Sequence, residues 1–206
     1  MKYAKKIPPT DKTLSEQLMG AGWKKLKEPS NLCMATLLSI PFAFLLGGTT
    51  IGIIYLLRPA LFDFLKASSF EIIFNIDLKI VLYIIVLFVF MAIHELIHAI
   101  FIPNFAQSDN TFFGINGLFG FVSTTEPIKK GRFIVISIMP FIILSVIFPI
   151  VLNLFQLLNG YMLFLCLLNA MGSCVDFLNI ILIIFQVPNK STVINNGFET
   201  FYNNVK

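Results

Sequence analysis

The sequence predicts an all-α membrane protein of four transmembrane helices, with a short β-hairpin between the second and the third. Of its 206 residues, 57% are hydrophobic, and the mean hydropathy is +0.85. Only 13% of the residues are charged, about half the usual share in soluble domains. The apolar residues gather in stretches long enough to cross a bilayer, where only helices and closed barrels satisfy their backbone groups. The length corresponds to one domain.

Four apolar stretches are expected to span the membrane: Leu32–Leu57, Leu78–Ile102, Arg132–Leu158 and Tyr161–Val187. The second and fourth are each followed by a proline, which does not continue a helix. Together they define a membrane domain over residues 32–187, between polar segments at 1–31 and 188–206. The first polar segment holds seven lysines and is either a solvated tail or a membrane-surface segment. Its apolar continuation begins only near Leu32, so no cleaved signal peptide is expected.

The connection 103–131 contains Asn116-Gly117 between aromatic and aliphatic residues. Asn-Gly in this setting is a signal for a two-residue hairpin turn, which predicts a hairpin within residues 111–124. The alternative is a Phe-rich loop that dips into the membrane interface.

Basic residues flank the spans unevenly. With a cytoplasmic N-terminus, the inner segments hold 12 Lys and Arg and the outer ones hold three. The positive-inside rule therefore predicts a multi-pass protein of the cell membrane with both termini in the cytoplasm. No nucleic-acid motif is present, so the bilayer is the partner that this charge indicates. The three cysteines are widely spaced in apolar segments, and no disulfide framework is expected.

The second span carries the sequence His94-Glu95-Leu96-Ile97-His98, which contains the only two histidines of the chain. In a helix, His94 and His98 lie one turn apart on one face, where two imidazoles can bind one zinc ion. Glu95 lies close enough to act on a water held by that ion. The alternative is a polar cluster that ties helices together, but ionisable groups inside a membrane usually serve function.

A catalytic zinc usually has a third protein ligand, and Asp176 is the candidate. Besides Glu95, it is the only acid deep in an apolar span. His94 lies about 12 Å and Asp176 about 16 Å from the cytoplasmic ends of their spans at 1.5 Å per residue, so their depths match. The alternative is a buried Asp paired with Asn or Ser in a helix contact. Asn169 and Ser173 lie on the same helix face and could orient Asp176 or a peptide carbonyl, or form interhelical hydrogen bonds instead.

The membrane-embedded His-Glu motif with an Asp on a later span resembles the site-2 protease class of intramembrane zinc metalloproteases. More closely, the chain resembles small bacterial membrane proteins of the DUF3267 family, described as zincin peptidases. The similarity covers most of residues 20–187, in four stretches: Gly22–Pro29, the His-Glu helix, Lys129–Pro140 and Asn169–Asp176. It implies that His94, His98 and Asp176 bind zinc and that Glu95 is the catalytic acid and base.

The site-2 pattern is not fully matched. Those proteases carry Asn-x-x-Pro eight residues before Asp-Gly, whereas Asn169 lies seven residues before Asp176, Gly172 takes the place of the proline and Phe177 follows the aspartate. A substrate-clamping role of Asn169 is therefore not implied.

These observations predict a membrane zinc metalloprotease that acts on a membrane protein or peptide, with the hairpin holding the substrate extended. The alternative is a non-catalytic zinc-binding membrane protein, such as a transporter, an immunity factor or a partner-binding factor. Glu95 favours catalysis, because a metal carrier needs ligands but not an adjacent base.

Overall fold

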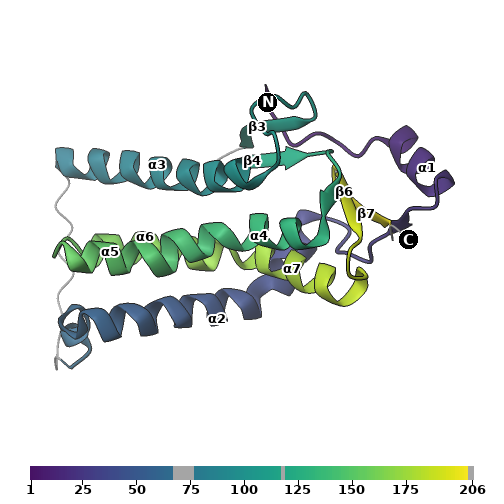
Figure 1. Ribbon diagram of the computed structural model, residues 1–206. Helices are drawn as coiled ribbons and strands as arrows, with labels where there is room; N and C mark the ends of the chain where they lie inside the picture. Colours follow the sequence, from purple (N-terminus) through teal and green to yellow (C-terminus); the bar gives the residue numbers. More distant parts are fainter. Residues whose placement is uncertain (67–76, 117–118, 204–206) are drawn as a thin grey trace.

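The computed structural model describes residues 1–66, 77–116 and 119–203 and consists mainly of long helices (Figure 1). Within these described residues, four helical spans are long and apolar enough to cross a membrane. They are α2 (Leu32–Leu57), α3 (Leu78–Phe101), the run Lys130–Leu154 and the run Gly160–Gln186. These bounds lie within a few residues of the four predicted spans, so a helix of membrane-spanning length and hydropathy is present at each predicted place.

The third and fourth spans are not continuous α-helices. The third consists of α4 (Lys130–Phe141), the π-helix η2 (Ile142–Ile147) and α5 (Phe148–Leu154). Pro140 and Pro149 flank this π-helix, and each removes an N–H from the helical ladder. The fourth consists of α6 (Gly160–Gly172) and α7 (Cys174–Gln186), which meet at Ser173 with ψ near 4°. A single fourth helix was predicted, so this break is a correction.

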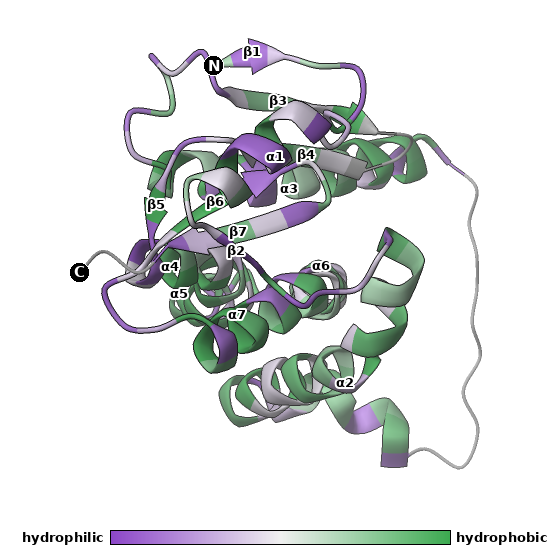
Figure 2. Cartoon of the chain, turned by 90° about the vertical axis from the view of Figure 1, so that its right-hand side faces the viewer, coloured by the Kyte–Doolittle hydropathy of each residue, from purple (hydrophilic) through white to green (hydrophobic). Residues whose placement is uncertain are grey.

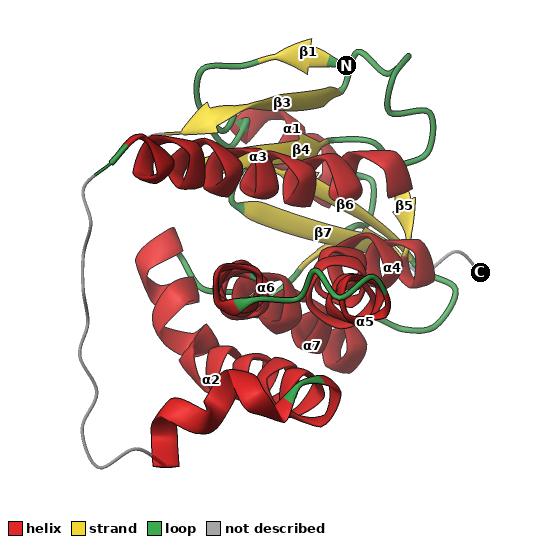
Figure 3. Cartoon of the chain, turned by 90° about the vertical axis from the view of Figure 1, so that its left-hand side faces the viewer, coloured by secondary structure: helices red, strands yellow, loops and turns green. Residues whose placement is uncertain are grey.

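α2 and α3 lie on opposite sides of the group formed by α4 to α7 (Figures 1 and 3). α2 packs on α6 and α7, and α3 packs mainly on α4. At Gly47 of α2, an added Cβ would lie 3.2 Å from Met171 of α6, so this glycine permits a close helix contact. The short 3₁₀ helix η1 (Pro59–Lys66) follows α2.

Two small sheets cover the polar end of the helices, where α1 (Lys12–Gly20) and both chain termini also lie (Figures 1 and 2). One has the order β1-β3-β4, built from β1 (Lys2–Tyr3), β3 (Thr111–Asn116) and β4 (Phe119–Thr124). The other has the order β2-β7-β6-β5, built from β2 (Lys24–Lys25), β5 (Ile128–Lys129), β6 (Thr192–Asn196) and β7 (Glu199–Asn203). The all-α expectation therefore holds for the spans but not for this polar layer.

The predicted hairpin is present, since β3 and β4 pair antiparallel from Thr111 opposite Thr124 to Asn116 opposite Phe119. Its Asn116-Gly117 turn includes residue 117, which lies outside the described residues. The same Asn-Gly signal recurs at Asn196-Gly197, where Gly197 has φ +61° and joins β6 to β7. The N-terminal and C-terminal segments meet in this layer, because β2 pairs with β7. The N-terminal β1 pairs with β3 of the first hairpin.

Candidate metal centre

Three candidate metal ligands, His94, His98 and Asp176, converge from two helices. His94 and His98 lie one turn apart near the end of α3, and Asp176 lies in the first turn of α7. The Oδ2 atom of Asp176 is 3.6 Å from Nε2 of His94 and 3.5 Å from Nε2 of His98. One ligand atom from each residue can be chosen so that all three lie within 4.8 Å of one another.

These separations suit a shared ion better than direct hydrogen bonds. Hydrogen bonds of this kind are usually 2.7–3.2 Å long. By contrast, zinc–ligand bonds of about 2.0–2.1 Å in a tetrahedral site place neighbouring ligand atoms about 3.3–3.5 Å apart. Two imidazoles and one carboxylate also form a donor set that zinc accepts in catalytic sites. The chemistry of the three side chains and the distance of each imidazole from Asp176 therefore fit a zinc ion.

In each imidazole, Nδ1 has a hydrogen-bond partner, which leaves Nε2 available to bind a metal ion. Nδ1 of His98 lies 2.8 Å from the carbonyl oxygen of Ile136. A carbonyl only accepts, so Nδ1 donates its proton and the lone pair of His98 remains on Nε2. Nδ1 of His94 lies 2.8 Å from Oδ1 of Asn169. Both Nε2 atoms therefore present lone pairs toward Asp176, as metal ligation requires.

The amide of Asn169 is itself held in one orientation. Its Nδ2 donates to the carbonyl of Pro140 at 3.2 Å and to Oγ of Ser145 at 2.8 Å. The hydroxyl of Ser145 in turn donates to the carbonyl of Cys166 at 2.8 Å. Because the amide nitrogen faces these acceptors, Oδ1 faces His94 and accepts its proton. Asn169 therefore lies in the site, in contact with His94.

Ser173 forms its side-chain hydrogen bond within its own span. Its hydroxyl donates to the carbonyl of Asn169, one turn earlier in the chain, at 2.9 Å. This hydrogen bond belongs to the junction between α6 and α7. The break at Ser173 places Asp176 in the first turn of α7.

Pro140 affects the site because proline has no backbone N–H group to donate. In a regular α-helix the carbonyl of Ile136 accepts a proton from the residue four positions later, and that residue is Pro140. Ile136 therefore has an acceptor to spare, which His98 uses. Ile136, Pro140 and Ser145 were not among the predicted site residues. The proline spacing indicates an unused carbonyl, but only the packing of α3 on α4 shows that His98 reaches it.

Glu95 lies beside the ligands and against β4. A Cβ atom added to Gly120 would lie 2.8 Å from Cγ of Glu95, so only glycine permits this approach without displacement. The carbonyl of Phe113 accepts from Ala4, so the polar backbone groups of Phe113 face β1. Along an antiparallel pair, the backbone N–H and C=O groups of successive residues point alternately toward and away from the partner strand. In this register, those of Gly120 and Val122 face away from β3.

Two cavities of different character adjoin the centre. One of about 210 Å³ is lined mainly by apolar groups of α3 and α6, and it reaches His94, Glu95 and Gly120. The other, of about 150 Å³, lies toward the polar layer and reaches His98 and Asp176. The centre is thus accessible from an apolar side and from a polar side.

The fold and the site together define a chain with four membrane-length helices and a candidate metal centre between two of them. A family model described as "Putative zincin peptidase", DUF3267, matches residues 87–192, slightly more than half of the chain. The chain therefore belongs to this family. The matched region contains all three candidate ligands and Glu95. No curated protein and no solved structure matches the chain.

Proposed function

We propose that the chain is a membrane-embedded zinc metalloprotease that hydrolyses peptide bonds of membrane-associated or transmembrane substrates. The observation that carries this proposal is the convergence of His94, His98 and Asp176 beside Glu95. The family's description as zincin peptidases supports the same reaction class. The proposal also extends the resemblance to site-2 proteases, whose motif the chain matches in part.

In this mechanism the chain's own side chains position the reactants and move protons. His94, His98 and Asp176 would hold zinc, which when bound supplies Lewis acidity and makes water a better nucleophile. Glu95 accepts the proton that the water loses as it attacks the peptide carbonyl. It then donates the proton to the leaving amine. Asn169 and the carbonyl of Ile136 keep both imidazoles in the tautomer that can bind the ion.

The outward edge of β4 is suited to hold a substrate extended. A transmembrane helix shields its peptide bonds in internal hydrogen bonds, so it must unwind before cleavage. The backbone groups of Gly120 and Val122 face away from β3, next to Glu95. A substrate segment that pairs with them as an added strand would have its carbonyls exposed beside the metal centre.

The proposed orientation places both termini and the polar layer in the cytoplasm, within a multi-pass protein of the cell membrane. It rests on the excess of Lys and Arg in the segments at that end of the helices. Reporter fusions after Lys206 and within residues 60–66 should report opposite sides of the membrane. Reports from the same side would remove a span from this arrangement.

The decisive experiment combines zinc analysis with cleavage of membrane peptides. Purified protein should hold about one zinc per chain, and alanine at His94, His98 or Asp176 should lower that content. Glu95→Gln should keep its zinc and its fold but lose roughly 10²–10⁴-fold in rate, because the amide cannot accept the proton. Glu16→Gln, on the exposed side of α1, is the matched control. Cleavage that survives Glu95→Gln unchanged would refute the protease assignment and favour a non-catalytic zinc protein.

A further inference from the structure

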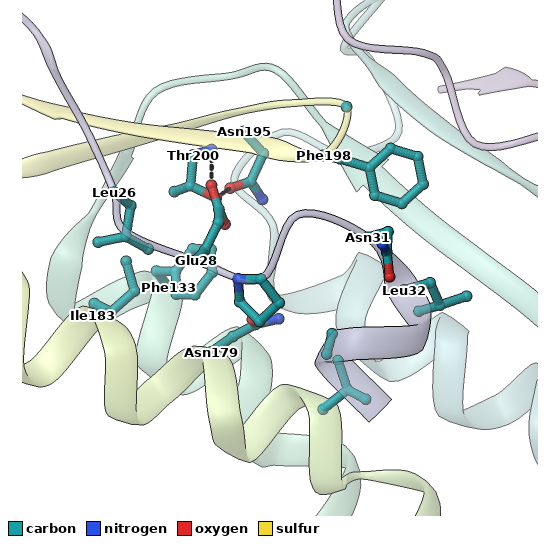
Figure 4. A pocket seen from close by; sticks show the side chains of 14 residues that line it. Leu26, Glu28, Asn31, Leu32, Phe133, Asn179, Ile183, Asn195, Phe198 and Thr200 are labelled. Atoms are coloured by element: carbon teal, nitrogen blue, oxygen red, sulfur yellow. Dashed lines mark hydrogen bonds between the residues drawn. The ribbon is translucent and has the colours of Figure 1, made fainter. Parts of the chain in front are cut away.

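A third cavity, of about 170 Å³, lies at the polar end of α7 (Figure 4). Its walls are the segment between β2 and α2, one face of α7, and the β6–β7 hairpin. Its lining includes the side chains of Asn31, Asn179 and Asn195 together with one carboxylate, that of Glu28. No lysine or arginine lines it among the described residues. The cavity is therefore polar on one side and carries a single negative charge.

Glu28 is fixed in this cavity by hydrogen bonds but has no ion-pair partner among the described residues. The backbone N–H of Thr200 donates to its Oε1 at 2.6 Å, and the hydroxyl of Thr200 donates to its Oε2 at 2.9 Å (Figure 4). In the described part of the chain, no Lys or Arg nitrogen lies within 4 Å of it. The nearby Glu199 differs, because Nζ of Lys25 binds it at 2.6 Å. Glu28 is thus a preorganised anion that no described Lys or Arg contacts directly.

The surroundings of these two acids affect their pKa values in opposite directions. Burial raises the pKa of the Glu28 carboxyl above its usual range, and the hydrogen bonds from Thr200 and the positive charge of nearby Lys25 offset this only in part. The hydrogen bond from Lys25 holds the pKa of Glu199 below its usual range. A partly desolvated carboxylate without a counter-ion gains most from a bound cation.

The cavity adjoins the polar side of the metal centre. Phe133, Asn179 and Asn195 line both this cavity and the one that contains His98 and Asp176. Ile183, which also lines this cavity, lies seven residues after Asp176 on α7, which is about 10 Å at 1.5 Å per residue. An extended peptide covers that distance in about three residues.

We propose that this cavity binds the side chain of an arginine or lysine in the substrate, about three to five residues from the cleaved bond. The assignment of the ligand to a peptide rests on the proposed function. The polar layer lies on the side where membrane proteins carry most of their basic residues, so a substrate would present such residues there. A guanidinium has five donors in one plane, which suit a carboxylate in a cavity that asparagine side chains also line.

The test uses the full chain, loaded with zinc in detergent, and a pair of dye-labelled peptides. Each peptide has an apolar segment followed by a polar flank, with arginine at the third, fourth or fifth flank position. Its twin has citrulline there, which keeps the shape but removes the charge. The expected result is that wild type binds the arginine peptide about 10-fold more tightly for at least one position. Glu28→Gln should abolish this preference, and Glu16→Gln should keep it.

The outcomes separate this site from the proposed function. Any one of three results would overturn the site. Wild type could bind both peptides equally, it could bind neither peptide, or the preference for arginine could persist in Glu28→Gln. A Glu28-dependent preference for arginine, without cleavage of the peptide above the Glu95→Gln level, would support the site and refute the protease. If Glu28→Gln does not fold, the comparison of arginine with citrulline on wild type decides alone.

Discussion

Asn169 tests how far the metal centre depends on residues that do not bind the ion. Replacement by leucine keeps the approximate volume but removes the oxygen that accepts from His94 and the nitrogen that donates to Pro140 and Ser145. Loss of such an orienting partner typically lowers metal affinity 10–100-fold, or about 1.4–2.7 kcal/mol. The two buried acceptors that lose Asn169 should reduce the free energy of unfolding by a further 1–3 kcal/mol or so.

Asn169→Asp separates the two contributions. The carboxylate retains an acceptor for His94 but loses both amide donors, so this variant should bind zinc more tightly than Asn169→Leu. Zinc affinity is measured by competition with a chromogenic chelator, and stability by thermal unfolding of the same samples. Asn153→Leu, on α5 and away from the centre, is the control. Wild-type zinc affinity in Asn169→Leu, or equal losses in the two variants, would show that Asn169 does not orient His94.

Three further outcomes follow from the same geometry. Pro140→Ala restores an N–H that competes for the carbonyl of Ile136, so zinc affinity should fall by up to about tenfold even though alanine favours the helix; an unchanged affinity would contradict this. Gly120→Val should push Glu95 from its place and abolish cleavage while zinc content stays the same, whereas Gly48→Ala, which meets open space, should be active. Removal of zinc by a chelator should lower the thermal midpoint reversibly, and an unchanged midpoint would argue against a metal bound by the folded state.

The metal centre shows which parts of a site can be predicted from sequence. The spacing of His94 and His98 places both on one face of any helix, so a helical span is enough to bring them together. Asp176 was a candidate because an acid so deep in an apolar span is costly without a partner. Its 3.5–3.6 Å approach to both imidazoles depends on the packing of the helices and on the break at Ser173. The sequence predicted this residue, and the tertiary structure supplied the distance.

The roles of Asn169 and Pro140 show the opposite case. The sequence left open whether Asn169 orients Asp176 or a peptide carbonyl or forms an interhelical hydrogen bond, and the structure shows an interhelical hydrogen bond, to His94. Neighbours along one helix follow from the 3.6-residue period, whereas contacts between helices depend on crossing angles that no short pattern encodes. The proline predicts an unsatisfied carbonyl at Ile136, but not the side chain that uses it.

The sequence by itself determined the four spans, the first hairpin and the residues of the metal motif. Each depends on local rules: apolar length, an Asn-Gly turn and side chains one helical turn apart. Only the tertiary structure decided that the N-terminal and C-terminal segments pair as β2 and β7, and that Glu28 and Thr200 form a cavity beside α7. The paired residues are more than 170 positions apart, as with Lys25 and Phe201. Pairing across such a separation is selected by the packing of the whole chain, so no local signal in either segment could have predicted it.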